Sequence, residues 1–129
     1  MVEYFSVWHY TVSHSQLLIR KRHRDIGTCH DIYFDGVKYF ELPTIFEEVI
    51  IEEPDEKDYE YIATRTIRAC KNLYVLRIEG KKYYVAASHM WNEENSLNDN
   101  ELPFYSGLRF EGKSDCFVSE KSKQGHEFV

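Results

Sequence analysis

The sequence predicts a mainly β fold, or a β-rich α+β fold, in which antiparallel hairpins form a small barrel or sandwich with at most one or two short helices. Two observations lead to this prediction. Apolar and polar residues alternate along several short stretches, which is the pattern of half-buried strands. An acidic residue followed by glycine recurs three times between such stretches, and this pair favours a hairpin turn.

The three hairpin signals are IYFDGVKYF at residues 32–40, LRIEGKKYY at residues 76–84 and LRFEGKSDCF at residues 108–117. The central positions of a tight hairpin turn require positive φ, which glycine adopts freely and aspartate adopts in part. Glu-Gly fits the same role with a bulge. We therefore expect hairpins centred near Gly36, Gly80 and Gly112, at unequal spacings that do not suit a solenoid with a fixed repeat.

The first strand is expected over Glu3–Val12. Its alternation predicts one face with Tyr4, Trp8, Tyr10 and Val12 and another with Phe5, Val7, His9 and Thr11. An unbroken strand from Glu3 to Arg22 would be about 65 Å long, which is too long for a small domain. The run Ser13–Ser15 favours a turn, because serine side chains bond nearby backbone groups. Further strands are expected over Gln16–Arg22 and Phe46–Glu52.

Residues 55–72 fit two structures. A helical face is formed by Tyr59, Ile62, Thr66, Ala69 and Leu73 after Pro54, which suits a first helical turn. The run TRTIRAC is rich in β-branched residues and fits a strand equally well. We favour a strand over Ile62–Cys70, with a turn at Lys71 and Asn72 and another strand over Leu73–Glu79. Residues 88–106 have no clean period and are interpreted as a long functional or mobile loop, or as a short helix.

The length of 129 residues predicts one β-rich domain over residues 1–118 and a mobile tail over residues 119–129. No apolar run is long enough to cross a membrane as a helix, and the N-terminus does not have the pattern of a signal peptide. Three widely spaced cysteines, Cys29, Cys70 and Cys116, fit a reducing compartment. We therefore expect a cytoplasmic protein with no membrane partner.

The motifs of enzymes and metal sites are missing from the sequence, so we predict no catalytic residues, no metal and no cofactor. Ser13 or Ser15 with His14 as a base would be too close in sequence for an ordinary triad. An enzyme would need His14 or His89 beside a carboxylate. Cys29 and His30 are adjacent, so as strand residues they face opposite sides, and a buried thiol beside a surface histidine is expected.

The charge pattern favours a protein partner over nucleic acid. The net charge is −6, which opposes binding to a phosphate backbone. The basic run Arg20–Arg24 is short, and we interpret it as a charged edge strand or loop that prevents aggregation. An acidic stretch of Glu47, Glu48, Glu52, Glu53, Asp55, Glu56 and Asp58 could engage a basic protein by complementary charge.

Our first hypothesis is therefore a non-enzymatic protein-interaction module, in one version an inhibitor or immunity-like protein that masks a basic toxin or nuclease. Residues 91–101 would add contacts from a second segment. The alternative is a small-ligand-binding β-barrel with an aromatic-lined pocket. Its candidate ligand-binding residues are Trp8, Tyr10, His14, Tyr39, Tyr83, Tyr84 and His89.

The run F-x-x-W-H-Y-T-V-S-H-S-Q-L-L-I-R at Phe5–Arg20 resembles the opening of small bacterial proteins that have no assigned activity. The resemblance covers about the first forty residues and includes HDIYFDGVKYFELP. It implies no catalytic residues. It implies only that this opening is a feature of a family.

Overall fold

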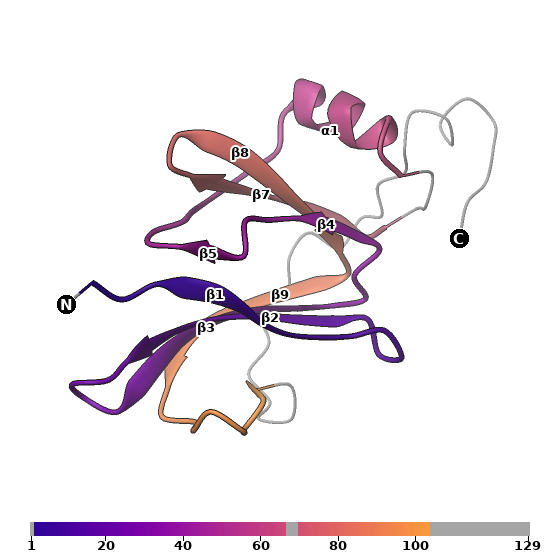
Figure 1. Cartoon of the computed structure of the whole chain (residues 1–129). Helices are drawn as coiled ribbons and strands as arrows, with labels where there is room; N and C mark the ends of the chain where they lie inside the picture. Colours follow the sequence, from indigo (N-terminus) through magenta and orange to yellow (C-terminus); the bar gives the residue numbers. More distant parts are fainter. Residues whose placement is uncertain (1, 67–69, 104–129) are drawn as a thin grey trace.

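Two antiparallel sheets lie face to face in the computed structural model, which describes residues 2–66 and 70–103 (Figure 1). The first sheet has the strand order β5-β1-β2-β3-β9 and the second has the order β4-β8-β7-β6. The first sheet contains β1 (Phe5–Thr11), β2 (Gln16–His23), β3 (Thr28–Asp35), β5 (Ile45–Phe46) and β9 (His89–Asn95). The second contains β4 (Tyr39–Glu41), β6 (Ile50–Glu52), β7 (Asn72–Ile78) and β8 (Lys81–Ala87). The prediction of a mainly β fold is confirmed, in its sandwich form rather than as a closed barrel.

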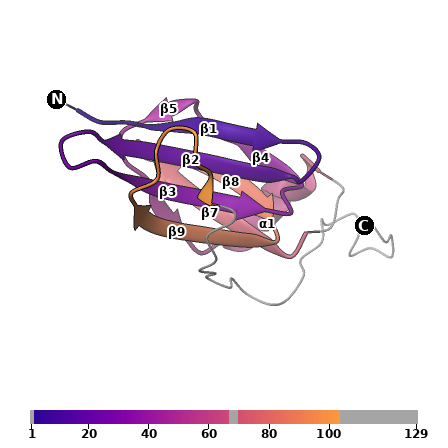
Figure 2. The same ribbon diagram turned by 90° about the horizontal axis from the view of Figure 1, so that it is seen from below.

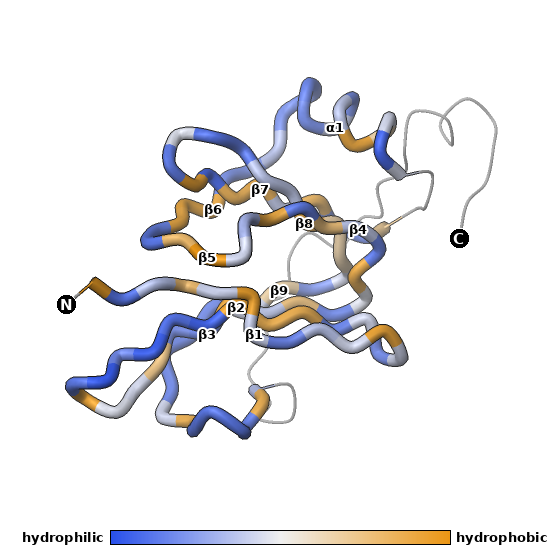
Figure 3. The backbone as a smooth tube through the Cα atoms, viewed as in Figure 1, coloured by the Kyte–Doolittle hydropathy of each residue, from blue (hydrophilic) through white to orange (hydrophobic). Residues whose placement is uncertain are grey.

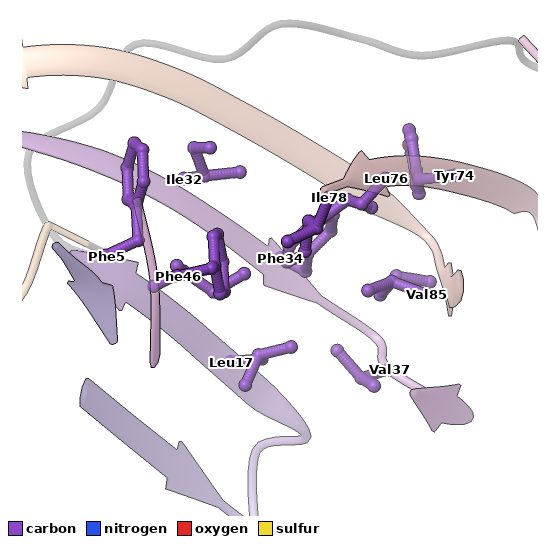
Figure 4. Packing of buried hydrophobic residues seen from close by; sticks show 12 residues of the cluster. Phe5, Leu17, Ile32, Phe34, Val37, Phe46, Tyr74, Leu76, Ile78 and Val85 are labelled. Atoms are coloured by element: carbon purple, nitrogen blue, oxygen red, sulfur yellow. The ribbon is translucent and has the colours of Figure 1, made fainter. Parts of the chain in front are cut away.

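Apolar side chains from both sheets meet between them. Phe5, Leu17, Ile32 and Phe34 come from the first sheet, and they are at most 3% exposed. The second sheet adds the inward-facing residues Tyr74, Leu76, Ile78 and Val85 (Figure 4). Many of the hydrophobic residues lie on the strands in the middle of the molecule (Figure 3), as expected where the inner faces of two sheets pack together.

The turn between β1 and β2 lies at Ser13–Ser15, as the length argument predicts. The amide of Ser15 donates to the carbonyl of Val12 at 3.3 Å. The predicted alternation along β1 is wrong at one point, because the register shifts between Val7 and His9. This bulge adds one residue to β1 and reverses the faces beyond it. Trp8 therefore packs on the outer face of the first sheet, while Tyr10 contacts Phe40 of the second.

Of the three predicted hairpins, the one at Gly80 is confirmed. β7 and β8 pair along their whole length around Glu79 and Gly80, whose φ angles are 52° and 80°. Positive φ at both central positions is the geometry expected for a two-residue turn that matches strand twist. The third predicted hairpin, at Gly112, lies outside the described residues.

The prediction at Gly36 is wrong. β3 does not pair with β4 there, because β4 pairs with β8 in the other sheet. Gly36 has a φ of 61°, and a Cβ on it would lie 2.3 Å from the Ser88 hydroxyl oxygen. The amide of Ser88 donates to the carbonyl of Asp35 at 2.9 Å. The Asp-Gly pair therefore moves the chain from one sheet to the other, and glycine is required by close packing as well as by φ.

Residues 55–72 begin with a helix, α1 (Glu56–Ala63), followed by a turn, so the strand preferred over Ile62–Cys70 is wrong from Ile62 to Thr66. Residues 67–69 lie outside the described residues. Asp55 and Asp58 form a reciprocal capping box, which satisfies two amides at the start of the helix. α1 covers the outer face of the second sheet, where Ile62 packs with Leu73, Val75, Tyr84 and Ala86 (Figure 1).

Residues 88–106 were expected to be a loop or a short helix, and most of the described part is a strand instead. β9 pairs with β3 from Asp35 to Cys29. Residues 96–103 then cross the outer face of the first sheet over β2 and β3 (Figure 2). They cover a small cluster of Leu18, Tyr33 and Trp91, with Trp8 and Leu102 packed against it. The predicted tail over residues 119–129 lies outside the described residues.

Candidate functional site

The acidic stretch begins along one side of the sandwich. β5 ends the first sheet and β6 ends the second, and the chain passes between these strands through residues 47–49. Among the strands that the structure describes, β5 pairs only with β1 and β6 pairs only with β7. Ile45 and Ile50 are 58% and 61% exposed. We define the acidic edge as Ile45, Glu47, Glu48, Ile50 and Glu53.

The seven acidic residues predicted to bind a partner have three different environments. The exposed ones are Glu47, Glu48, Glu53, Asp55 and Glu56. Glu52 is half-buried, and its carboxylate accepts two hydrogen bonds from Arg77, at 2.8 and 3.1 Å. These bonds hold the pKa of Glu52 below its ordinary value and offset its charge. Glu52 therefore contributes little net charge to the surface.

Asp58 is buried at 2% exposure and is not a surface residue. Its carboxylate accepts hydrogen bonds from the hydroxyl of Tyr84 at 2.8 Å and from the ammonium of Lys82 at 3.1 Å. It also completes the capping box with Asp55. Asp58 therefore fastens the start of α1 to β8, and a sequence pattern of clustered acids cannot distinguish this residue from its exposed neighbours.

A hollow of about 220 Å³ opens beside the acidic edge, between the two sheets. Its apolar wall is formed by Phe5, Ile32, Val49, Ile50 and Ile51. Its polar rim is formed by Lys21, His30, Glu48 and Asn92. An apolar hollow with a charged rim can accept one hydrophobic side chain of a partner while the rim charges guide its approach.

The seven predicted ligand-binding residues do not share one pocket. Trp8 lies on the outer face of the first sheet, and Tyr10 and Tyr83 pack at the central core. Tyr39 and Tyr84 lie on the opposite face of the second sheet, with α1. The Tyr39 hydroxyl donates to Glu41 at 2.6 Å, and burial followed by this bond raises the pKa of Tyr39 to about 12. The aromatic residues therefore fill three separate layers.

His14 lies on the exposed turn between β1 and β2. Its Nδ1 is 2.9 Å from the Ser13 hydroxyl, so the two side chains contact each other. A nucleophile needs a base that is itself oriented and sheltered from water. Both residues are exposed, and this pair is explained by a local hydrogen bond.

His89 has the carboxylate neighbour that an enzyme hypothesis requires. Its Nδ1 is 2.9 Å from Asp35 Oδ1, which orients the ring. Its Nε2 is 3.3 Å from the ammonium of Lys71. In an ordinary dyad the second nitrogen faces a nucleophile or substrate, and here it faces a cation. The three side chains therefore tie the start of β9 to the start of β7.

The basic run Arg20–Arg24 is not a charged edge strand, because β2 lies between β1 and β3. Its side chains alternate between the faces of the first sheet. Lys21 lies over the ring of Phe5 and donates to the backbone carbonyl of Glu47 at 2.5 Å. Arg20 is fully buried, at 0% exposure. Strand periodicity predicts that Arg20 and Arg22 share a face, but it does not predict that one of them is buried.

Arg20 makes a paired contact with Asp31 of β3, with Nε–Oδ1 at 2.7 Å and Nη2–Oδ2 at 3.0 Å. It also donates to the carbonyls of Asn98 and Glu101 at 3.0 and 2.9 Å. Burial alone would lower the pKa of Arg20, but the hydrogen bonds and charge of Asp31 hold it above its ordinary value. Arg20 therefore binds residues 96–103 to the sheet.

Cys29 and Cys70 are buried thiols, and the prediction that Cys29 and His30 face opposite sides of β3 is confirmed. The Cys29 thiol lies 2.8 Å from the side-chain oxygen of Asn95, whereas the His30 ring packs against Phe5. Burial is the main cause that raises the pKa of the Cys29 thiol. A protonated buried thiol is a poor nucleophile.

In the described parts of the chain, residues 2–66 and 70–103, no group of three or more His, Cys, Asp or Glu side chains is arranged to hold a metal ion. No helix within these ranges has the length and apolar character needed to span a bilayer. No protein-family model, no curated protein and no solved structure matches the chain.

Proposed function

We propose that the protein is an interaction module whose acidic edge binds a basic, extended segment of a protein partner. The observation that carries this proposal is the pair of exposed isoleucines, Ile45 and Ile50, on two short edge strands that flank Glu47 and Glu48. Charged residues alone on a sheet edge would be explained as protection against aggregation. Large exposed apolar side chains at the same place favour contact with a partner instead.

The chemistry of the partner follows from the edge. A basic partner is favoured by the carboxylates of Glu47, Glu48 and Glu53 and by the net charge of −6. An extended segment is favoured because β6 is an edge strand among the described residues. Its backbone N–H and C=O groups on the side away from β7 can form hydrogen bonds with an added strand. One apolar residue of the segment would enter the hollow beside Glu48. An inhibitor that masks a basic toxin or nuclease is one protein of this kind.

The test uses a labelled synthetic peptide of alternating lysine and valine, with an alternating glutamate and valine peptide for comparison. Fluorescence anisotropy should show binding of the lysine peptide that weakens as salt rises, because the rim charges are exposed. The variant Glu48→Lys should weaken binding several-fold. Ile50→Ser should weaken it at high salt as well, because it removes an apolar contact and leaves the charge of the edge unchanged.

The matched control is Asp25→Lys, which makes the same change in charge at an exposed position away from the acidic edge. It should leave the affinity within about twofold of the parent protein. If Asp25→Lys weakens binding as much as Glu48→Lys does, peptide binding depends only on the net charge of the protein, and the acidic edge is not the site. Absence of binding by the lysine peptide at low salt would also overturn the proposal.

A further inference from the structure

Two surface hollows on the outer face of the first sheet share Arg22 and Arg24 in their linings. One has a volume of about 520 Å³ and is lined by both arginines with Gly27, Asn98, Asp99 and Asn100. The other has a volume of about 360 Å³, and its wall includes the same two arginines with Tyr4 and Trp8. We call the two hollows together the arginine groove. Each is within the size range of small-molecule sites.

The guanidinium of Arg22 is not saturated with hydrogen bonds. Its Nη2 is 2.8 Å from Asp99 Oδ1, which makes an ion pair, and the Arg22 side chain is only 13% exposed. Nevertheless its Nε is shielded from solvent and makes no hydrogen bond. Shielded donors without an acceptor are costly, and they usually have a partner in the working state of a protein. A small shift of this side chain toward an anion in the groove would supply that partner.

Three carboxylates, those of Glu3, Asp25 and Asp99, line the groove together with the two arginines, and two of them already have partners. Glu3 accepts hydrogen bonds from the His23 ring at 2.9 Å and from the Arg24 amide at 3.0 Å. Asp99 is 58% exposed and is the ion-pair partner of Arg22. Arg24 is exposed and lines both hollows. An anion placed there would meet two guanidinium groups, whose planar forks suit phosphate oxygens.

The second hollow offers an aromatic wall beside these cations. The Trp8 indole is held in place, because its Nε1 donates to the Asp99 carbonyl at 3.2 Å and Arg20 lies against its ring. Tyr4 is 48% exposed. A flat ring system can stack on such side chains without regard to its exact substituents. The groove therefore combines a site for a phosphate with a site for an aromatic ring.

We propose that the arginine groove binds a nucleoside monophosphate, with the phosphate at Arg22 and Arg24 and the base against Tyr4 and Trp8. This site lies apart from the acidic edge and does not depend on the function proposed for that edge. Asn98 and Asn100 would provide amide groups on the far side of the phosphate.

The experiment is a titration of the full chain with adenosine monophosphate, followed by calorimetry and by tryptophan fluorescence. Trp91 is 7% exposed and stacked on Tyr33, so a change in emission on binding reports on Trp8. Inorganic phosphate and adenosine are titrated separately. We expect both to bind more weakly than the nucleotide, because each engages only one part of the groove.

The double variant Arg22→Gln/Arg24→Gln should weaken nucleotide binding about tenfold or more. The control Lys38→Gln/Lys81→Gln removes the same charge at two exposed lysines outside the groove and should leave the affinity unchanged. Tyr4→Leu should reduce nucleotide affinity while leaving phosphate affinity as it was. Thermal denaturation checks that each variant folds. If the double arginine variant does not fold, Tyr4→Leu still tests the groove.

Three results would overturn the inference. The first is no binding of the nucleotide at millimolar concentration. The second is that the lysine control weakens nucleotide binding as much as the arginine variant does. Binding would then depend only on the overall charge of the protein. The third is a pair of results: inorganic phosphate and the nucleotide bind with equal affinity, and Tyr4→Leu does not change the affinity for the nucleotide. The groove would then bind an anion but not the base.

Discussion

Arg20 and Arg22 lie two residues apart on the same face of β2, yet their surroundings differ completely. Arg20 is fully buried and makes four hydrogen bonds, two to the Asp31 carboxylate and two to carbonyls of residues 96–103. Arg22 lies beside that segment, where its Nη2 contacts one exposed carboxylate, that of Asp99, and its Nε makes no hydrogen bond. A saturated guanidinium holds a fold together, whereas an unsaturated one is available to a ligand.

The largest expected effect is that of Arg20→Met, which leaves the Asp31 carboxylate buried without its partner. We expect a loss of about 3–5 kcal/mol in the free energy of unfolding. Urea denaturation followed by tryptophan fluorescence measures it. The double variant Arg20→Met/Asp31→Leu should recover much of the loss, because it removes the unpaired charge. If the single variant costs less than about 1 kcal/mol, Arg20 does not have the role that we give it.

A smaller effect is expected from Asp99→Asn, which removes the only carboxylate paired with Arg22 among the described residues. If that carboxylate competes with a ligand, the variant should bind adenosine monophosphate about two- to fivefold more tightly, in line with the weak energy of an exposed ion pair. Calorimetry provides the comparison with the parent protein. Weaker binding would mean that Asp99 supports the ligand site instead of competing for it.

The substitution Arg22→Met tests whether Arg22 contributes less than Arg20 to the free energy of unfolding. Its ion pair with Asp99 is partly exposed, so its loss should change the free energy of unfolding by less than about 1 kcal/mol. The measurement is the same urea experiment as for Arg20→Met. A loss as large as that of Arg20→Met would show that both arginines are structural and would remove the basis for the comparison.

The smallest effect concerns pH. His23, next to Arg22, contacts Glu3 at 2.9 Å and Glu94 at 3.5 Å, and the hydrogen bond to Glu3 is the main cause that raises its pKa. The stabilisation is therefore complete below the ordinary histidine value of 6.5 and is lost as the pH rises through the higher folded value. His23→Asn should show a smaller fall in stability between about pH 6 and pH 8 than the parent protein. Identical pH curves for the two proteins would contradict this assignment.

Local patterns predicted a large part of the fold. The Ser13–Ser15 turn and the Glu-Gly turn at Gly80 depend on neighbours in sequence, and the structure agrees with both. The alternation predicted along β1 holds only as far as the bulge after Val7. The errors occur where contacts between segments far apart in the sequence determine the structure. Gly36 has the chemistry of a hairpin, but Ser88 occupies the space beside it and β4 finds its partner in β8.

The candidate sites were predicted less completely, for the same reason. The acidic stretch was visible in the sequence, but the burial of Asp58 depends on Tyr84 and Lys82 of a distant strand. The arginine groove depends on residues 98–100, which reach Arg22 only because Arg20 fastens the segment. A period of two along β2 places Arg20 and Arg22 on one face, and this was the one signal in the sequence that pointed to the groove.

Ser88 alone separates β8 from β9, so the chain passes from the second sheet to the first within one residue. β8 pairs with β7 in the second sheet, and β9 pairs with β3 in the first. At the same corner the chain crosses back through Gly36, where Ser88 fills the space that a side chain would need. Because these two crossings join the sheets, we expect the described residues to unfold in one cooperative transition.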